Sequence, residues 1–383
     1  MPPVAAKPIR SGERWIAPAI LFDGSRLREG VALRLKEGRI DDIVPVDRVP
    51  AGTAMTRLDG TLTPGLFDIQ VNGGGGVLFN TDCTVDGLRN LCEAHRRLGT
   101  SHLLPTVITD TPDTLDAAAR AVIDAGGRFG IRGIHIEGPH IDPERRGTHA
   151  RHLIRPLDDR TRDTIAMLRR ETVAVLLTLA PEAVSPGDIA ALANAGVVVS
   201  LGHSNAKGAA VEAALAEGAR TFTHLFNAMS PMGSREPGLV GTAINSDAWC
   251  SIICDGIHVS FDMVGLAIRA RPVRDRMILV SDAMATVGGP DSFELYGQSI
   301  RVEHGRLVNA EGNLAGAHVS LLECVQRLVR HVGRPPEEAL RMAWTHPSQL
   351  MGFEHDIQEA ALDASELMLL DRNLEFAGYL ADA

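Results

Sequence analysis

The chain lacks long apolar runs, paired cysteine motifs and an excess of basic residues, and each absence excludes a class of protein. None of its apolar stretches reaches the roughly 18 residues that a membrane-spanning helix needs. Lys and Arg number 38 against 48 Asp and Glu, and the resulting net charge of -10 argues against a general nucleic-acid-binding surface. The stretch 1–14 mixes Pro, Lys, Arg and Glu without an apolar core, which predicts no secretion signal.

Cysteine is scarce, and its spacing predicts neither a disulfide framework nor a zinc-binding knuckle. The number of cysteines is odd, and no two of them form a Cys-x-x-Cys pair. The five are Cys83, Cys92, Cys250, Cys254 and Cys324. We therefore expect reduced thiols and a cytoplasmic protein.

The composition and length of the chain are typical of a folded globular protein. Apolar residues make up 45% and charged residues 22%, which is ordinary for a globular domain. A length of 383 residues suits one large domain of barrel size with a smaller appendage.

Eight mostly apolar runs alternate with segments of helical period through the middle of the chain. The runs that we expect to be strands are 65–72, 102–109, 131–137, 173–180, 197–202, 221–225, 251–254 and 277–281. The segments that we expect to be helices include 85–98, 114–125, 159–169, 206–217 and 261–271. Strands that are apolar throughout are typical of a parallel sheet covered by helices on both faces.

This count favours a (β/α)8 TIM barrel over a doubly wound open sheet, which remains the alternative. Both ends of the chain instead carry short strand-like pieces, which in the N-terminal stretch are separated by Asp-Gly and Glu-Gly turn signals. We expect residues 1–62 and 346–383 to pair into one small β domain beside a catalytic barrel of residues 63–345.

Polar residues stand where four of the expected strands end. Glu137 ends the third strand, His203 the fifth, His224 the sixth and Asp282 the eighth. In a (β/α)8 barrel these ends meet at one face. A carboxylate and two imidazoles suit a divalent metal ion with a coordination position left open for water, and Asp282 could move the proton of that water.

Each of these residues has a simpler explanation when it is taken alone. A single histidine at a strand end is more often hydrogen-bonded in a structural role, and a single aspartate there often caps the next helix. Four such residues at four strand ends favour the metal site.

The motifs resemble those of the amidohydrolase superfamily, and within it the N-acetylglucosamine-6-phosphate deacetylases. The similar segments are PGLFDIQVNG (64–73), HIEGP (135–139), RRGTH (145–149), LGHS (201–204), THLFNAM (223–229), SDAM (281–284) and THP (345–347). Together they extend over nearly the whole chain. The resemblance implies a distorted (β/α)8 barrel with a small β-sandwich built from both termini.

The resemblance also implies an activity, namely hydrolysis of N-acetyl-D-glucosamine 6-phosphate to D-glucosamine 6-phosphate and acetate. Glu137, His203 and His224 would bind the metal, and Asp282 would act as base and then as acid. His149 would lie near the acetamido carbonyl, where it would help to polarise the carbonyl or hold the sugar. The remaining residues that would contact the substrate are Thr148, Asn227, Ala228, Arg235, His258, Leu314, Ala315 and Gly316.

The resemblance assigns the phosphate to His258 and Arg235, with Arg235 reaching across from the neighbouring subunit of a homodimer. It also exposes a departure from the wider superfamily, in which the first strand ends in His-x-His. Here Gln70 and Asn72 stand at those positions, and neutral amides are poor ligands for a divalent metal. We therefore expect one metal ion per subunit. Zn²⁺ is our first choice, with Fe²⁺, Co²⁺ and Mn²⁺ as alternatives.

Other activities stay open at this point. A related amidohydrolase would act on N-acetylgalactosamine 6-phosphate or on a cyclic amide. A non-catalytic barrel that only binds is disfavoured, because the ligand and base positions are all present. We expect no nucleic-acid or membrane partner.

Overall fold

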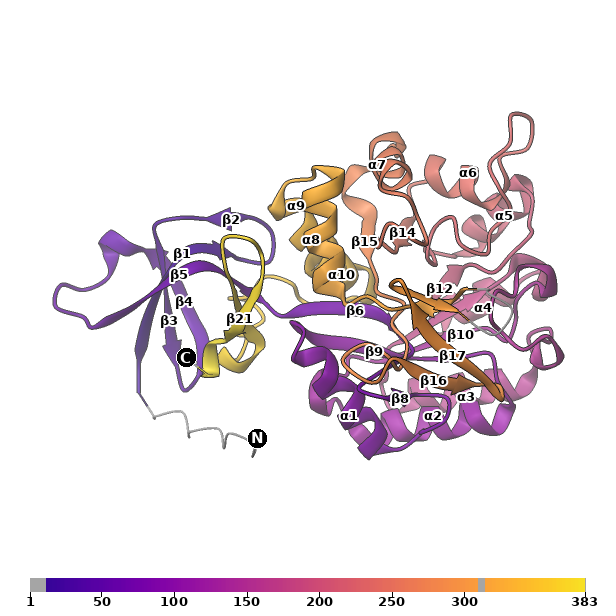
Figure 1. The fold of residues 1–383 in the computed structure, drawn as a ribbon, viewed down its shortest axis with the longest axis horizontal. Coiled ribbons are helices and arrows are strands. Elements are labelled where there is room, and N and C mark those ends of the chain that lie inside the picture. Colours follow the sequence, from indigo (N-terminus) through magenta and orange to yellow (C-terminus); the bar gives the residue numbers. More distant parts are fainter. Residues whose placement is uncertain (1–11, 309–313, 383) are drawn as a thin grey trace.

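The computed structural model describes residues 12–308 and 314–382. Residues 1–11, which open the expected terminal domain, lie outside the described residues, as do 309–313 and 383. The chain forms a barrel with a separate sheet at one side, and the first and last described strands both belong to that sheet (Figure 1). No helix in the described part is both long enough and apolar enough to cross a membrane.

The eight expected barrel strands are all present, and they form one parallel eight-stranded sheet in sequential order. They are β6 (Leu66–Val71), β9 (Thr100–Ile108), β10 (Ile134–Glu137), β11 (Val175–Leu179), β12 (Val198–Leu201), β13 (Thr221–Phe222), β14 (Trp249–Ile252) and β15 (Met277–Leu279). Every residue of these strands is buried, which explains why they are apolar without alternation. The expected barrel is confirmed.

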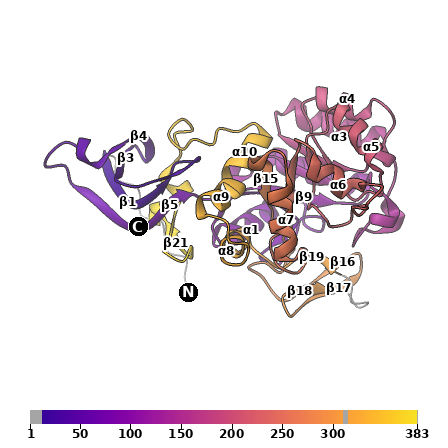
Figure 2. The ribbon, with the colours of Figure 1, turned by 90° about the horizontal axis from the view of Figure 1, so that it is seen from above.

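Helices connect the barrel strands and cover the outside of the sheet (Figures 1 and 2). They are α1 (Val85–Arg96), α2 (Pro112–Ala125), α3 (Asp159–Arg170), α4 (Asp188–Asn194), α5 (Gly208–Glu217), α6 (Gly238–Asn245), α7 (Phe261–Ala270), α8 (Leu321–Val332), α9 (Pro336–Leu340) and α10 (His346–Met351). Several begin where a side chain caps the first free amides. Thr84, Asp158 and Ser260, for example, accept hydrogen bonds from the first turns of α1, α3 and α7.

The barrel closes unevenly between its first and last strands. No ladder joins β6 to β15; one parallel bridge links Val71 to Ala283 beyond the end of β15. The carboxylate of Asp68 accepts a hydrogen bond from the amide of Ser281 at 3.2 Å, and the amide of Asp282 donates to the carbonyl of Gln70 at 3.1 Å. This distortion places the end of the first strand directly beside Asp282.

Both ends of the chain contribute to a seven-stranded sheet, as expected from their short strand-like pieces. Its strands are β1 (Arg14–Phe22), β2 (Leu27–Arg28), β3 (Val31–Lys36), β4 (Arg39–Pro45), β5 (Met55–Pro64), β20 (Leu367–Leu370) and β21 (Phe376–Tyr379). β5 pairs with β1 and with β20, so it joins the two ends of the chain. β5 itself extends past residue 62, and α10 packs against β6 and β15, so the division at 62/63 and 345/346 stays a prediction.

A four-stranded antiparallel sheet lies between β15 and α8 and was not expected from the sequence. It consists of β16 (Ser292–Leu295), β17 (Gln298–Glu303), β18 (Arg306–Val308) and β19 (Leu314–Ala317). Figure 2 shows this sheet at the edge of the barrel. A smaller pair, β7 (Gly73–Gly74) and β8 (Val77–Leu78), follows β6, and a π-helical turn (Arg341–Thr345) precedes α10. The inserted sheet supplies one wall of the pocket described next.

Candidate active site

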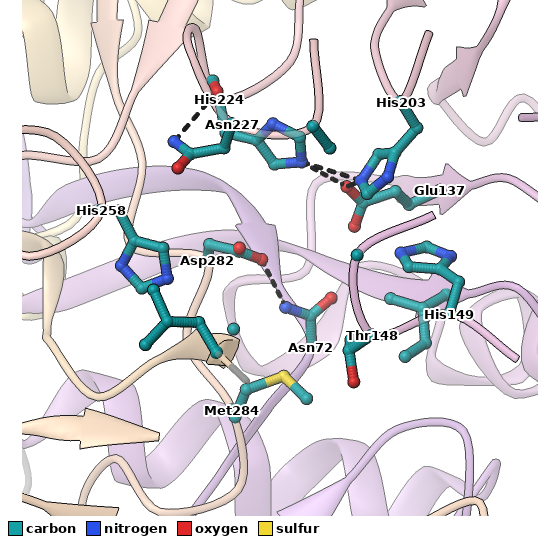
Figure 3. Close-up of a pocket in the computed structure, with 15 residues that line it drawn as sticks. Asn72, Glu137, Thr148, His149, His203, His224, Asn227, His258, Asp282 and Met284 are labelled. Atoms are coloured by element: carbon teal, nitrogen blue, oxygen red, sulfur yellow. Dashed lines mark hydrogen bonds and ion pairs between the residues drawn. The ribbon is translucent and has the colours of Figure 1, made fainter. Parts of the chain in front are cut away.

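A pocket opens at the carboxyl ends of the barrel strands, where the polar residues identified in the sequence meet (Figure 3). Glu137 is the last residue of β10. His203 and His224 each follow within two residues of the ends of β12 and β13. Asp282 follows β15. Four separate strands therefore deliver these side chains to one point.

Glu137, His203 and His224 converge closely. Oε1 of Glu137 lies 3.1 Å from Nε2 of His203 and 2.9 Å from Nε2 of His224, and the two imidazole nitrogens are 3.0 Å apart. All three side chains are buried. Burial alone would raise the pKa of Glu137, but its hydrogen bonds with His203 and His224 hold that pKa well below the usual range.

The chemistry of these donor atoms fits a divalent cation. Nδ1 of His203 lies 2.8 Å from the carbonyl oxygen of Arg145 and must donate to it, because a carbonyl only accepts. A neutral His203 therefore directs the lone pair of Nε2 toward the carboxylate oxygen and toward His224. Lone pairs that face one another at this distance repel unless a metal ion or a proton lies between them, and a carboxylate with two imidazoles is a typical zinc ligand set.

Asp282 faces this cluster from the other side of the pocket and is held by two amides. Nδ2 of Asn72 donates to its Oδ1 at 2.7 Å. Nε2 of Gln70 lies between the two carboxylates, 3.2 Å from Oδ1 of Asp282 and 3.1 Å from Oε1 of Glu137. Burial, together with the nearby charge of Glu137, raises the pKa of Asp282 to about 6. Asp282 is thus a fixed carboxyl group suited to proton transfer near neutral pH.

Two further histidines line the pocket. His149 packs its ring 4.5 Å from that of His203, and its Nδ1 is 2.6 Å from the hydroxyl of Thr109. Burial lowers the pKa of His149 to about 3. His258 is held by Asp255, whose Oδ2 lies 2.6 Å from Nδ1 of the imidazole. The ligand atoms of Glu137, His149 and His203 also lie within 4.8 Å of one another, so His149 is close enough to be considered a metal ligand itself.

Several of these residues have a left-handed backbone that non-glycine residues rarely adopt. The φ angles are +48° at His203, +36° at His224, +51° at Ala228 and +53° at Asp282. Strained backbone of this kind concentrates at functional sites, where the surrounding structure holds it in place. Backbone strain at these four positions supports the interpretation of this pocket as a functional site.

The structure brings most of the residues expected from the sequence into this pocket. Those that line it are Asn72, Glu137, Thr148, His149, His203, His224, Asn227, Ala228, His258, Asp282, Leu314 and Gly316. Gln70 is buried behind the two carboxylates, and Ala315 is buried next to the lining residues. Arg235 is exposed on the loop before α6 and does not line the pocket of its own chain.

The sequence reasoning missed some contributors. Ile108, Gly147 and Met284 line the pocket as well, and Thr109 contacts His149. Ile108 ends β9 and Thr109 follows it, so the strand-end rule that found Glu137 would have identified both. Isoleucine and threonine are not typical metal ligands or general bases, so these two positions did not indicate a site in the sequence.

Comparison with known proteins agrees with this geometry. The family model described as the amidohydrolase family matches residues 61–359. The chain is 40% identical over 296 residues to an N-acetylgalactosamine-6-phosphate deacetylase of Shewanella sp. (strain ANA-3), covering 76% of this chain and 74% of the relative. It is 32% identical over 322 residues to an N-acetylglucosamine-6-phosphate deacetylase of Haemophilus influenzae, covering 82% and 84%.

Among solved structures, the N-acetylglucosamine-6-phosphate deacetylase from Pasteurella multocida superposes with a TM-score of 0.87 at 30% identity, covering 96% of this chain and 98% of that one. The match includes both the barrel and most of the terminal sheet, because it extends over nearly the whole of each chain. The chain therefore belongs to the amidohydrolase family.

Proposed function

We propose that this chain is a metal-dependent deacetylase that hydrolyses the acetamide group of an N-acetylated amino-sugar 6-phosphate. The preferred substrate is N-acetyl-D-glucosamine 6-phosphate, and the products are D-glucosamine 6-phosphate and acetate. The observation that carries the proposal is the convergence of Glu137, His203 and His224 to within 3.1 Å, opposite the fixed carboxyl group of Asp282. Relatives named for this activity support the choice of substrate.

In this proposal Glu137, His203 and His224 hold one divalent ion, and Zn²⁺ is the first candidate, with Fe²⁺, Co²⁺ and Mn²⁺ also suited to the donor set. Such an ion supplies Lewis acidity, which acidifies water and polarises an amide carbonyl. The direction in which the side-chain amides of the first strand point supports a single ion. Because carboxylates only accept hydrogen bonds, Gln70 and Asn72 must turn their NH₂ groups toward Asp282, and those groups offer no lone pair to a second cation.

Residues of the chain then transfer the proton, bind the substrate carbonyl and position the base. Asp282 takes a proton from the attacking water and returns it to the leaving nitrogen, for which a pKa near neutrality is suited. His149 donates a hydrogen bond to the acetamido carbonyl oxygen. Gln70 and Asn72 keep the carboxyl group of Asp282 in position through the hydrogen bonds described above.

The remaining polar side chains of the pocket suit a sugar phosphate. Thr148 and Asn227 offer neutral polar groups for hydroxyls, together with the backbone of Ala228 and the turn of Leu314, Ala315 and Gly316. His258, paired with Asp255, is the candidate phosphate ligand within the chain. Arg235 is exposed, which suits a role in the pocket of a second subunit, so we also propose a homodimer.

Galactosamine specificity is the second candidate function, since the relative at 40% identity is named for N-acetylgalactosamine 6-phosphate. The two sugars differ at one ring carbon, so the shared chemistry of the pocket serves either.

A cytoplasmic location belongs to the same proposal, because all five cysteines are free thiols, and thiols persist in reducing compartments.

Acetate release tests this proposal. The purified chain, loaded with Zn²⁺, is assayed with N-acetylglucosamine 6-phosphate, N-acetylgalactosamine 6-phosphate and unphosphorylated N-acetylglucosamine. We expect both phosphorylated sugars to react, the glucosamine compound faster, and the unphosphorylated sugar to react poorly. Equal kcat/KM with and without the phosphate would contradict the assignment of His258 and Arg235. Absence of acetate release from every substrate would contradict the activity itself.

A further inference from the structure

Among the described residues, Thr109 is the one whose side chain forms a hydrogen bond with a ring nitrogen of His149. It follows the end of β9, and its hydroxyl lies 2.6 Å from Nδ1 of the imidazole. Both residues are buried, with 0% of Thr109 and 3% of His149 exposed. The carbonyl of Thr109 also accepts a hydrogen bond from the hydroxyl of Tyr296, in the turn between β16 and β17. The inserted sheet therefore helps to hold Thr109 in place.

The surrounding backbone leaves just enough room for the Thr109 hydroxyl. Gly138, which follows β10, has a left-handed φ of +76°, and a Cβ atom there would lie 2.3 Å from Oγ1 of Thr109. Any side chain at position 138 would displace the hydroxyl from His149. The contact between Thr109 and His149 is thus built into the packing of two neighbouring strand ends.

The direction of this hydrogen bond determines which nitrogen of His149 carries the hydrogen. A neutral imidazole has one N–H and one lone pair. Among the hydrogen bonds of residues 12–308 and 314–382, the Thr109 hydroxyl has no acceptor other than Nδ1 of His149. When the hydroxyl donates, Nδ1 is the acceptor and the hydrogen of His149 is on Nε2. His203 is the opposite case, because its Nδ1 faces a carbonyl and must itself donate.

We propose that Thr109 is a positioning residue, which holds neutral His149 as the Nε2–H tautomer and thereby makes it a hydrogen-bond donor to the substrate rather than a metal ligand. The two roles need opposite tautomers: binding an ion through Nε2 requires the hydrogen on Nδ1, and polarising a carbonyl requires it on Nε2. His149 lies close enough to Glu137 and His203 for either role. Thr109 decides between them. The inference rests on the proposed deacetylase function.

Nitrogen NMR tests the tautomer without reference to activity. The full-length Zn²⁺-loaded protein is labelled with ¹⁵N-histidine, and the signals of His149 are identified by their loss in the His149→Gln variant. We expect a protonated Nε2 and an unprotonated Nδ1. A protonated Nδ1 with Nε2 bound to the metal would overturn the proposal. In the Thr109→Val variant, which keeps the shape but removes the hydroxyl, the His149 pattern should change to a mixture of tautomers.

Kinetics supply the functional part of the test. Thr109→Val should lower kcat for N-acetylglucosamine 6-phosphate roughly tenfold with little change in KM, because only the Nε2–H tautomer of His149 can donate to the substrate carbonyl. Thr109→Ser retains the hydroxyl and should restore most of the activity. Thr221→Val is the matched control, because its hydroxyl is buried in β13 without a hydrogen-bond partner in the described structure.

The outcomes distinguish a failure of the role proposed for Thr109 from a failure of the proposed deacetylase function. If Thr109→Val and Thr221→Val lose activity equally, Thr109 acts only through packing and the proposal fails. If no variant, nor the wild type, releases acetate, the proposed function fails, and the NMR result still decides the tautomer.

Discussion

At the scale of single residues, the pocket depends on side chains that hold other side chains. Asn72 and Gln70 fix Asp282, Thr109 contacts His149, and Asp255 holds His258. Gln70 and Asn72 were singled out in the sequence as positions that replace a second metal site, but Thr109 and Asp255 were not recognised, because a threonine or an aspartate near a strand end has many ordinary explanations. That Glu137, His203, His224 and Asp282 meet in one pocket was predictable, since histidine and carboxylate at several strand ends form an unusual pattern.

The pKa of Asp282 leads to an expected pH dependence. A general base must be unprotonated, and burial beside Glu137 raises the pKa of Asp282 to about 6. A cation bound to Glu137, His203 and His224 would lower that value. The logarithm of kcat/KM should therefore fall with a slope of about one below a midpoint at or under pH 6. Measurement between pH 4.5 and 8, with fluorescence to confirm that the chain stays folded, checks this. A midpoint above pH 7 would contradict Asp282 as the base.

Asp255 should matter through His258. The Asp255 carboxylate accepts hydrogen bonds from Nδ1 of His258 and from the amides of Ile257 and His258, which fixes the ring at the pocket wall. In Asp255→Asn we expect KM for the phosphorylated sugar to rise roughly tenfold with a smaller change in kcat, since a charge-assisted hydrogen bond is lost. Asp262→Asn, an exposed substitution on α7, is the control. An unchanged KM would remove His258 from phosphate binding.

At the scale of secondary-structure elements, continuous apolar runs identified the barrel strands because all of their residues are buried. The inserted sheet of β16 to β19 was not predicted from the sequence, for the opposite reason. β16 and β17 are largely exposed and rich in polar residues, so they lack the apolar runs of the barrel strands. The uneven seam between β6 and the loop after β15 was equally hidden, because it depends on tertiary hydrogen bonds such as that from Ser281 to Asp68.

The start of α8 offers a test of local stability that leaves the pocket untouched. Ser320 and Glu323 form a capping box, in which each side chain accepts a hydrogen bond from the backbone of the other residue. Ser320→Ala should lower the free energy of unfolding by about 1 kcal/mol without changing kcat. Urea denaturation measures the effect, with the exposed Ser299→Ala in β17 as the control. Equal stability of the two variants would show that the cap contributes nothing.

At the scale of the whole molecule, Glu366 links the terminal segment to the barrel. Its carboxylate lies 2.9 Å from Nε2 of His102 in β9 and 3.4 Å from Arg132, and it also accepts from the amide of Asp363 at 3.0 Å. That the two ends of the chain share a sheet was predictable from the short strand-like pieces at each end. The link through Glu366 was not, since nothing in the sequence joins residues so far apart.

This link gives the fold an expected acid sensitivity. Burial alone would raise the pKa of Glu366, but hydrogen bonding to His102 and the charge of Arg132 lower it to about 2. A lowered pKa means that the ionised group stabilises the fold above pH 4.5 and that this contribution is lost as the pH falls toward 2. Glu366→Gln should therefore be less stable at pH 7 by on the order of 1–3 kcal/mol. The difference from wild type should shrink between pH 4.5 and 3. A constant difference in urea denaturation would contradict the link.

The most direct test of the whole account is to measure bound metal and acetate release together in the wild type and in Asp282→Asn. Because Asp282 is assigned to proton transfer and not to metal binding, the variant should retain one ion per chain. Its kcat on N-acetylglucosamine 6-phosphate should nevertheless fall by roughly 10²–10⁴, the usual contribution of a general acid–base residue. Retained turnover in Asp282→Asn, or full activity of a wild-type chain stripped of metal, would contradict the mechanism.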